Sequence, residues 1–270
     1  MKKLICSRFV TSAFALVMTL ALAKLIIAAE KKEARVTHVI KDVRLLASKA
    51  APRPASLNDN VREGTAVRTG GDSRAELTFT DQTLTRLGAN TIFSFGQGAR
   101  QFDLSNGAIL LCVPKESGTV RISTAATTAA VTGFTALFEF HPKSWCKFII
   151  LEGHGWIALK KFPNEKKELG PGQIIIFRAD ARNLPDVHEV DLSKLVNDAM
   201  LITQFRQLPS WAWQPILKEI ENQKISPPSS GFIDPTGHDK IDQRSQIEQP
   251  TPTRMHSPPE ETPHDGRRRP

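Results

Sequence analysis

The feature that most constrains the fold is a succession of short segments in which apolar and polar side chains alternate. In "RAELTFT", Ala75, Leu77 and Phe79 point to one side and the residues between them to the other. Similar extended runs are "TLTRL", "TIFSF", "AILLCV", "TVRIST", "FTALFEF", "CKFIILEG", "GWIAL" and "QIIIF". Turn residues separate nearly all of them, and no long helical pattern suggests parallel βαβ units. The pattern predicts an all-β antiparallel domain, built as a sandwich, barrel or solenoid.

A helical signal comes only after the strands, in residues 191–225. The apolar positions of "DLSKLVNDAMLITQFRQ" share one face: Leu192, Leu195, Val196, Ala199 and Met200. Asp191 is a suitable N-cap and Pro209 is expected to close this helix. A shorter helix is expected next, with Pro215 near its start and Ile216, Leu217 and Ile220 facing inward. We expect Trp211 and Trp213 to pack at the junction rather than to form a ligand platform.

The two ends of the chain differ in composition from the middle. Residues 1–29 combine a basic start, "MKKLICSR", with an apolar run, which is the layout of a signal peptide cut after Ala23 or Ala29. The alternative is an uncleaved anchor in the inner membrane, since residues 9–29 are long enough to cross a bilayer. Nine of the eighteen prolines fall in residues 226–270, and large apolar residues are rare there. We expect this segment to be a disordered tail because it has little surface to bury.

The charge of the chain argues against nucleic acid as a partner. Removal of residues 1–29 takes away four basic residues and lowers the formal net charge from +8 to +4. Nucleic-acid binding requires clustered basic residues, and single-strand binding requires aromatic residues between them. Neither pattern occurs in residues 30–225. The expected location is the periplasm or the exterior, with the N-terminal anchor in the inner membrane as the alternative.

Several of these segments, in their order, resemble a FecR-type extracytoplasmic domain. The first part of the resemblance is "VREGTAVRTGGDSRAELTFTDQTLTRLGANTIFSF", and the second includes "GAILLCVP", "VRISTAATTAAVTGFTALFEF", "FIILEGHGWIAL" and "LGPGQIIIF". The resemblance covers residues 35–177. The resemblance implies a FecR-like β domain over residues 30–190 and a function in receiving a signal or binding a partner outside the cytoplasm.

The chain departs from the FecR pattern in ways that bear on function. It has Gly133-Phe134 where a Gly-Thr pair is usual, and Asp81-Gln82 where an Asp-Gly turn is usual. Both preserve the β interpretation, but they weaken the inference of a shared ligand or partner surface. FecR-type regulators also carry a cytoplasmic segment that engages a sigma factor. Here eight residues precede the apolar run, so we do not expect a direct anti-sigma role.

A search for catalytic or metal-binding groups yields no converging set. The seven histidines lie at positions 38, 141, 154, 188, 238, 256 and 264, without a pair at helical ligand spacing. His141, His154, Asp81 and Glu152 are interpreted as turn residues. "GPGQ" at 170–173 lacks the lysine of a phosphate loop, "GHG" at 153–155 lacks a dinucleotide fingerprint, and no G-x-S-x-G elbow occurs. We therefore predict no catalytic, cofactor-binding or metal-binding residues, no cofactor, and no enzyme activity.

The leading functional hypothesis is a non-enzymatic module that binds an envelope protein or a cell-surface component. The alternative is a structural envelope protein that assembles with itself. A secreted carbohydrate-active enzyme is a third possibility, and it would need a pair of carboxylates in a cleft.

Cys112 and Cys146 remain after removal of the signal peptide, which also carries Cys6. Each is expected on a strand, and an oxidising compartment would permit a disulfide that closes a loop of about 34 residues. Two buried reduced thiols are the alternative, and the sequence does not decide between them.

Overall fold

The structure is a computed structural model that describes residues 33–96 and 100–235. Its strands are β1 Ala34–Ile40, β2 Val43–Leu46, β3 Arg53–Pro54, β4 Asn60–Val61, β5 Ala66–Thr69, β6 Arg74–Phe79, β7 Leu84–Leu87, β8 Ile92–Gly96, β9 Gln101–Val113, β10 Thr119–Ser123, β11 Thr127–Phe140, β12 Trp145–Leu159, β13 Lys166–Leu169, β14 Gln173–Arg178 and β15 His188–Glu189. The helices are η1 Lys115–Ser117, α2 Leu192–Asp198, α3 Met200–Thr203 and α4 Ser210–Ile225. The predicted signal peptide lies outside the described residues.

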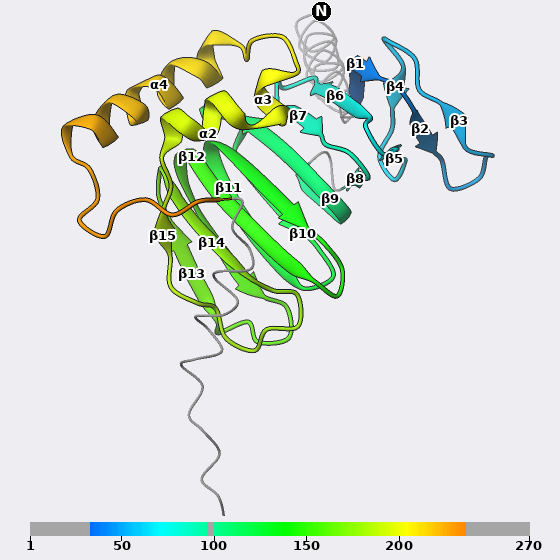
Figure 1. Cartoon of the computed structure of the whole chain (residues 1–270). Helices are drawn as coiled ribbons and strands as arrows, with labels where there is room; N and C mark the ends of the chain where they lie inside the picture. The colour runs from blue at the N-terminus through cyan, green and yellow to red at the C-terminus, as the bar shows by residue number, and fades with distance from the viewer. Residues whose placement is uncertain (1–32, 97–99, 236–270) are drawn as a thin grey trace, which may run out of the picture.

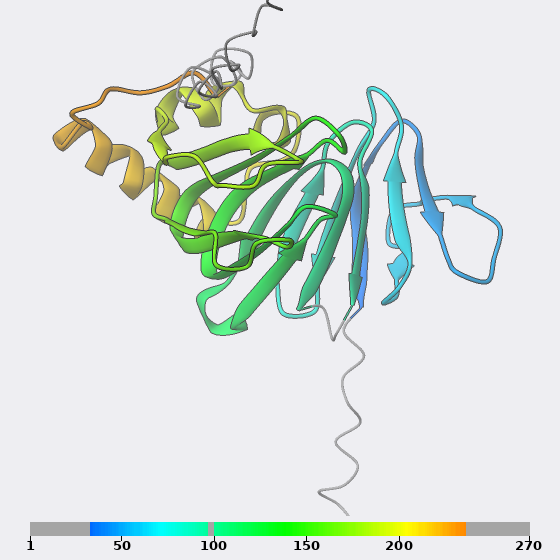
Figure 2. The ribbon, with the colours of Figure 1, turned by 90° about the horizontal axis from the view of Figure 1, so that it is seen from below.

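The described strands form one hydrogen-bonded sheet, whose main path runs β15-β14-β12-β11-β10-β9-β7-β6-β1-β4. Strand β9 is central. The part before Gly107 pairs with β8, and the part from Gly107 onward pairs with β11 and, over residues 109–112, with β7. Gly107 has a φ of +95°, a backbone conformation that favours glycine. The sheet curves strongly along this path (Figures 1 and 2). The predicted all-β class is confirmed, although β10 runs parallel to β9, which the sequence did not indicate.

The side chains of the sheet divide between two apolar clusters. The inner cluster fills the curve of the sheet and includes Phe138 and Phe148, whose ring centroids lie 5.3 Å apart. The second cluster joins the opposite face to the helices and includes Leu110, Leu195 and Ile216. Figure 1 shows α2, α3 and α4 together on one side of the strands. Because side chains alternate along each strand, those on one face pack within the curve of the sheet and those on the other face pack against the helices. The strands therefore contribute to two apolar clusters.

The break that we expected between "CKFIILEG" and "GWIAL" does not occur. Both belong to one strand that pairs with β11 from Thr127 to Phe140, with a register shift around Thr135. Gly153 accommodates this irregularity with a φ of +85°, where an added Cβ would press against the carbonyl oxygen of Gly133. The turn interpretation of Glu152 and His154 is therefore wrong, since both lie within the strand.

The helical region also differs in detail from the prediction. Asp191 caps α2 as expected, accepting a hydrogen bond from the backbone N–H of Lys194 at 3.0 Å. The single expected helix is interrupted at Ala199, and Met200 is 56% exposed instead of facing the core. The next helix, α4, is the longer one, and Leu217 lies exposed on it, whereas Trp211 and Trp213 pack against the second cluster as predicted. No helix within the described ranges is long and apolar enough to cross a membrane.

The first part of the predicted tail is packed against the protein. Ile233 joins the second apolar cluster, and its backbone N–H donates to the carbonyl oxygen of Glu189 at 2.9 Å. Lys147 donates from Nζ to the carbonyl oxygen of Pro235 at 3.0 Å. The expected boundary at Ser226 therefore comes too early for residues 226–235, and the rest of the predicted tail lies outside the described residues.

The disulfide between Cys112 and Cys146 is not formed, and both thiols are free and buried. Cys112 pairs with Thr135 of β11, whereas Cys146 pairs with Phe140 of the same strand, about 16 Å farther along at the rise of an extended strand. The two side chains also belong to different apolar clusters on opposite faces of the sheet. A bridge requires Cα atoms within about 7 Å, so this geometry excludes it.

Candidate functional site

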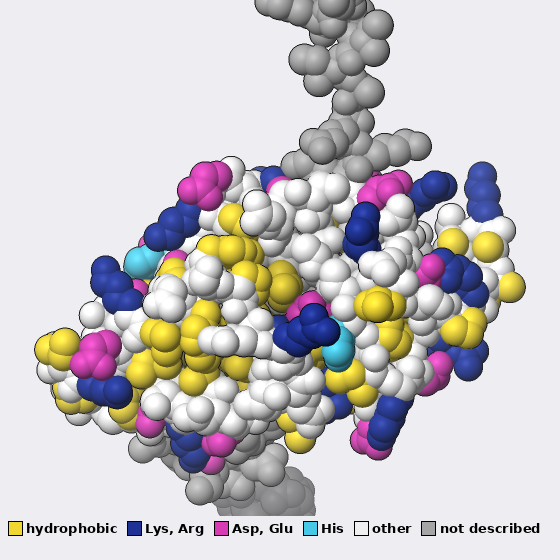
Figure 3. All heavy atoms as spheres, turned by 90° about the horizontal axis from the view of Figure 1, so that it is seen from above, with side chains coloured by type: hydrophobic (Ala, Val, Ile, Leu, Met, Phe, Trp, Pro, Cys, Tyr) yellow, Lys and Arg dark blue, Asp and Glu magenta, His cyan; other side chains and the backbone are white. Residues whose placement is uncertain are grey.

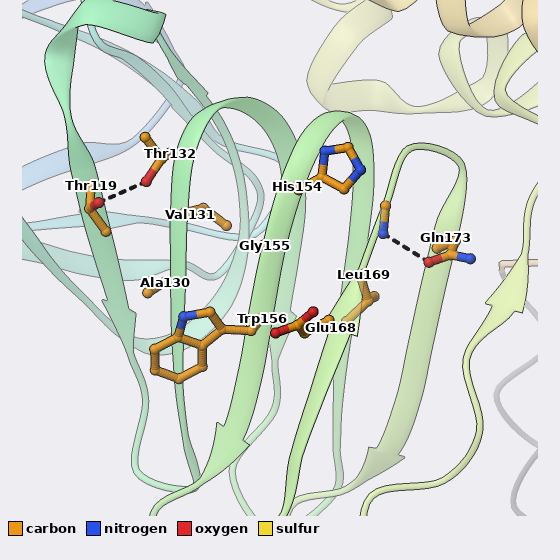
Figure 4. Close-up of a pocket in the computed structure, with 11 residues that line it drawn as sticks. Thr119, Ala130, Val131, Thr132, His154, Gly155, Trp156, Glu168, Leu169 and Gln173 are labelled. Atoms are coloured by element: carbon orange, nitrogen blue, oxygen red, sulfur yellow. Dashed lines mark hydrogen bonds between the residues drawn. The ribbon is translucent and has the colours of Figure 1, made fainter.

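An open groove of about 600 Å³ lies on the outer face of the sheet where β10, β11, β12 and β13 run side by side (Figure 4). Its rim and floor come from eleven residues: Thr119, Ala130, Val131, Thr132, His154, Gly155, Trp156, Glu168, Leu169, Gly170 and Gln173. Most of these side chains are small or polar, and Trp156 supplies a large aromatic surface. Such a lining suits a ligand that is held by hydrogen bonds and by one apolar contact.

The register of the strands explains why these side chains share one face. His154 and Trp156 are two positions apart on β12, so both point away from the inner cluster. His154 lies opposite Thr132 of β11, and Trp156 lies between Ala130 of β11 and Glu168 of β13. The intervening Gly155 faces the inner cluster, where an added Cβ would press against Val131.

A charged pair lies beside the indole of Trp156. Lys166 places Nζ 4.9 Å from the centroid of this ring and 3.5 Å from Oε1 of Glu168. A cation over an aromatic face is attracted by the quadrupole of the ring, which holds the indole in a defined orientation. The indole of Trp156 and the carboxylate of Glu168 therefore lie side by side in the groove.

Gln173, at the start of β14, is held in place by two hydrogen bonds. Its Oε1 accepts from the backbone N–H of Gly170 at 2.8 Å, and its Nε2 donates to Oε1 of Glu189 at 2.8 Å. On the far side of the groove the hydroxyls of Thr119 and Thr132 lie 2.7 Å apart and bond to each other (Figure 4). Because their neighbours already hold these side chains, the groove is preorganised for binding.

The polar groups of the groove bond mainly to one another. A nucleophilic site needs a hydroxyl or thiol hydrogen-bonded to a base, whereas the two threonine hydroxyls bond to each other. Among residues 33–96 and 100–235, no three His, Cys, Asp or Glu side chains gather as metal ligands. The face in Figure 3 carries acidic and basic side chains interspersed with apolar ones.

The residues considered for chemistry in the sequence lie apart. Asp81 is in a turn as predicted, where it accepts from the backbone N–H of Thr83 at 3.0 Å and pairs with Arg100 at 3.1 Å. Glu152 is buried on β12, where burial raises the pKa of its carboxyl group. The structure does not bring these two carboxylates together in the groove.

The described histidines are also separate. His38 packs its ring 5.6 Å from that of Phe205, and His141 places Nε2 3.1 Å from Oε1 of Glu139. His188 lies on β15, and His154 alone contributes to the groove. His238, His256 and His264 lie outside the described residues.

Sequence reasoning missed the groove because its members are spread over residues 119–173. His154 and Gln173 had been assigned to turns, and Trp156 was noted only as part of a strand. The alternation of "GHGWIAL" does place His154 and Trp156 on one face, but the sequence does not reveal which strands flank them.

Comparison with known proteins identifies a family for the part of the chain that contributes five of the eleven groove residues. The family model described as FecR protein matches residues 65–154. Two crystal structures of a "putative anti-sigma factor" from Parabacteroides distasonis ATCC 8503 are similar to this chain with a TM-score of 0.40 and 12% identity. Each alignment covers 52% of this chain and 74% of the other. Curated proteins gave no match. The family match lies within the resemblance drawn from the sequence and confirms it there: residues 65–154 form a domain of the FecR protein family.

Proposed function

We propose that this chain is an exported, non-enzymatic module of the cell envelope that binds a protein partner through the groove around His154 and Trp156. The FecR-family domain supports a regulatory or signal-receiving role. The observation that carries the proposal is the placement of the groove at the C-terminal end of the family match: β11 and the part of β12 up to His154 lie within the match, and Trp156 follows two positions later.

The physical argument for a protein partner is the mixture of groups in the groove. Trp156 offers an amphipathic aromatic surface of the kind enriched at interfaces, and Glu168, Gln173 and His154 surround it with hydrogen-bonding groups. The groove is shallow and open, so a side chain or loop of a partner can enter without opening the sheet.

Photo-crosslinking in intact cells tests the partner. A photoreactive amino acid at Thr132, on the rim of the groove, should give an adduct with a second envelope protein. The matched control is the same amino acid at Leu57, which is 62% exposed in the segment between β3 and β4, and it should give no such adduct. Adducts of Thr132 with other copies of this chain alone would reject the proposal in favour of a self-assembling structural protein.

Export is tested separately by cell fractionation and by the mass of the recovered protein. We expect a periplasmic or secreted chain that begins after Ala23 or Ala29. A full-length chain retained in the inner membrane would show instead that residues 1–29 act as an anchor.

A further inference from the structure

A second cavity, of about 710 Å³, lies between the sheet and the helical layer. Ala108, Leu137 and Ile149 contribute to its sheet side, Leu195 and Leu201 to its helical side, and Ile233 to its C-terminal side. This volume is in the range of small-molecule sites, and the cavity is separate from the groove on the outer face. An apolar ligand could therefore enter it without contacting His154 or Trp156.

Among the residues that the structure describes, one basic side chain of the cavity has no acidic partner. Arg74, on β6, lines the cavity and is only 9% exposed. Its Nε is buried and has no hydrogen-bond partner, and its Nη2 donates to the thioether sulfur of Met200 at 2.9 Å. A thioether is a weak acceptor, and a buried charge is costly unless it is paired. The edge formed by Nε and Nη2 is therefore available to an anion.

The acidic residues around the cavity are engaged elsewhere or exposed. Glu139 pairs with Lys147 at 3.0 Å, and Asp191 caps α2. Asp198 is exposed at the end of α2, and Asp234 lies on the C-terminal segment. Glu139 and Asp191 are therefore held by partners other than Arg74.

Arg86 shows how the same fold satisfies a buried guanidinium. It is 1% exposed, and its Nε donates to Oε2 of Glu76 at 2.8 Å. Its two terminal nitrogens donate to the carbonyl oxygens of Leu201 and Arg206 at 3.1 and 2.6 Å. Arg74 lies twelve positions before Arg86, on the neighbouring strand β6, and within the described residues no comparable set of acceptors surrounds it. Since Arg86 has protein acceptors and Nε of Arg74 has none, we infer that a bound ligand supplies the acceptor for Arg74.

We propose that this cavity binds a single-chain fatty acid, with its carboxylate on Arg74 and its alkyl chain between the sheet and the helices. The two nitrogens along one edge of a guanidinium match the two oxygens of a carboxylate, so the head group would replace the sulfur of Met200. The alkyl chain would contact Ala108, Leu137 and Leu195. Ile233 and Pro235 hold the C-terminal segment against the cavity through the hydrogen bonds to Glu189 and from Lys147.

Isothermal titration calorimetry on the full chain tests this proposal with dodecanoate below its micellar concentration and with 1-dodecanol as the neutral control. We expect saturable binding of dodecanoate and binding of dodecanol that is at least about tenfold weaker, because only the acid can pair with Arg74. Equal affinity for the two compounds, or no binding of dodecanoate, would overturn the proposal.

Two variants separate loss of binding from loss of fold. Arg74→Met should weaken dodecanoate by about tenfold to a hundredfold and leave dodecanol nearly unchanged, whereas Arg68→Met, at an exposed arginine on β5, should change neither. Ala108→Leu should weaken both compounds because the larger side chain fills the cavity. Circular dichroism confirms that each variant is folded. A folded Arg74→Met variant with unchanged affinity for dodecanoate contradicts the proposal.

Discussion

Arg86 of β7 donates a hydrogen bond from Nη1 to the carbonyl oxygen of Leu201 at 3.1 Å, across a separation of 115 positions in the chain. The same guanidinium bonds to Glu76 through Nε and lies 4.7 Å from the ring centroid of Phe205. One buried side chain thus connects the FecR-family domain to the end of α3. The helical segment is therefore integrated with the sheet by polar contacts as well as by the second apolar cluster.

We expect Arg86→Met to lower the free energy of unfolding by about 3 to 5 kcal/mol. The substitution preserves apolar volume but leaves Glu76 without its cationic partner, and the carbonyl groups of Leu201 and Arg206 lose their donors. Urea unfolding provides the measurement. The control Arg68→Met, at an exposed position, should stay within about 0.5 kcal/mol of the parent protein. A decrease of less than about 1 kcal/mol in the free energy of unfolding would show that the bonds of Arg86 between the sheet and the helical segment contribute little to stability.

Cys112 and Cys146 should remain reduced in the folded protein, even in an oxidising buffer. Burial raises the pKa of each thiol to about 12, so the reactive thiolate is scarce at neutral pH. We expect slow alkylation of the native protein at pH 8 and modification of both thiols after unfolding without reductant. Mass analysis under non-reducing conditions checks this. A mass two hydrogens lower, with no alkylation of these two residues after unfolding, would contradict the strand register.

We expect Glu152→Gln to stabilise the protein at neutral pH. Burial raises the pKa of Glu152 in the fold, with Lys115 opposing this effect and Glu219 adding to it. Folding therefore favours the protonated carboxyl, and this contribution is present below the ordinary Glu pKa and lost as the pH rises through the higher folded value. Glutamine is neutral throughout.

The melting temperature of Glu152→Gln should consequently exceed that of the parent at pH 7.5, with the difference shrinking towards pH 4. Thermal unfolding over this range is the measurement. The control is Glu116→Gln, at an exposed position on η1, which should lack this pH-dependent gain. A variant of Glu152 that is less stable than the parent at pH 7.5 would mean that the carboxylate makes a net favourable interaction in the fold.

The class of the fold followed from the sequence because alternation is a local property. Ala75, Leu77 and Phe79 all reach the inner cluster, as the pattern of "RAELTFT" indicates. The path of the sheet was not predictable in the same way. The parallel pairing of β10 with β9 and the continuity of β12 through Gly153 depend on partners far along the chain. The interruption at Ala199 also escaped prediction, because its apolar spacing fits an uninterrupted helix.

The candidate site was less predictable than the fold. His154 and Gln173 had been noticed in the sequence, but only strand register places them around one groove with Trp156. Arg74 was interpreted as a solvent-facing residue of an amphipathic strand. The helices cover that face, and this burial gives the side chain its unusual surroundings. Tertiary packing, which the local sequence does not reveal, therefore determines which polar side chains line the groove and the cavity.

The final prediction concerns where the packed chain ends. A chain that stops after Ile225 should be less stable than one that stops after Pro235, by about 1 to 3 kcal/mol. The shorter chain loses the apolar contact of Ile233 and the hydrogen bond from its N–H to Glu189, and Lys147 loses its acceptor at Pro235. Urea unfolding of the two truncated proteins measures the difference. Ile233→Ala in the longer chain tests the apolar contact alone and should reproduce about half of the loss. Equal stability of the two truncated proteins would show that residues 226–235 contribute nothing to the fold, which the composition of this segment had suggested and which the contacts of Ile233 argue against.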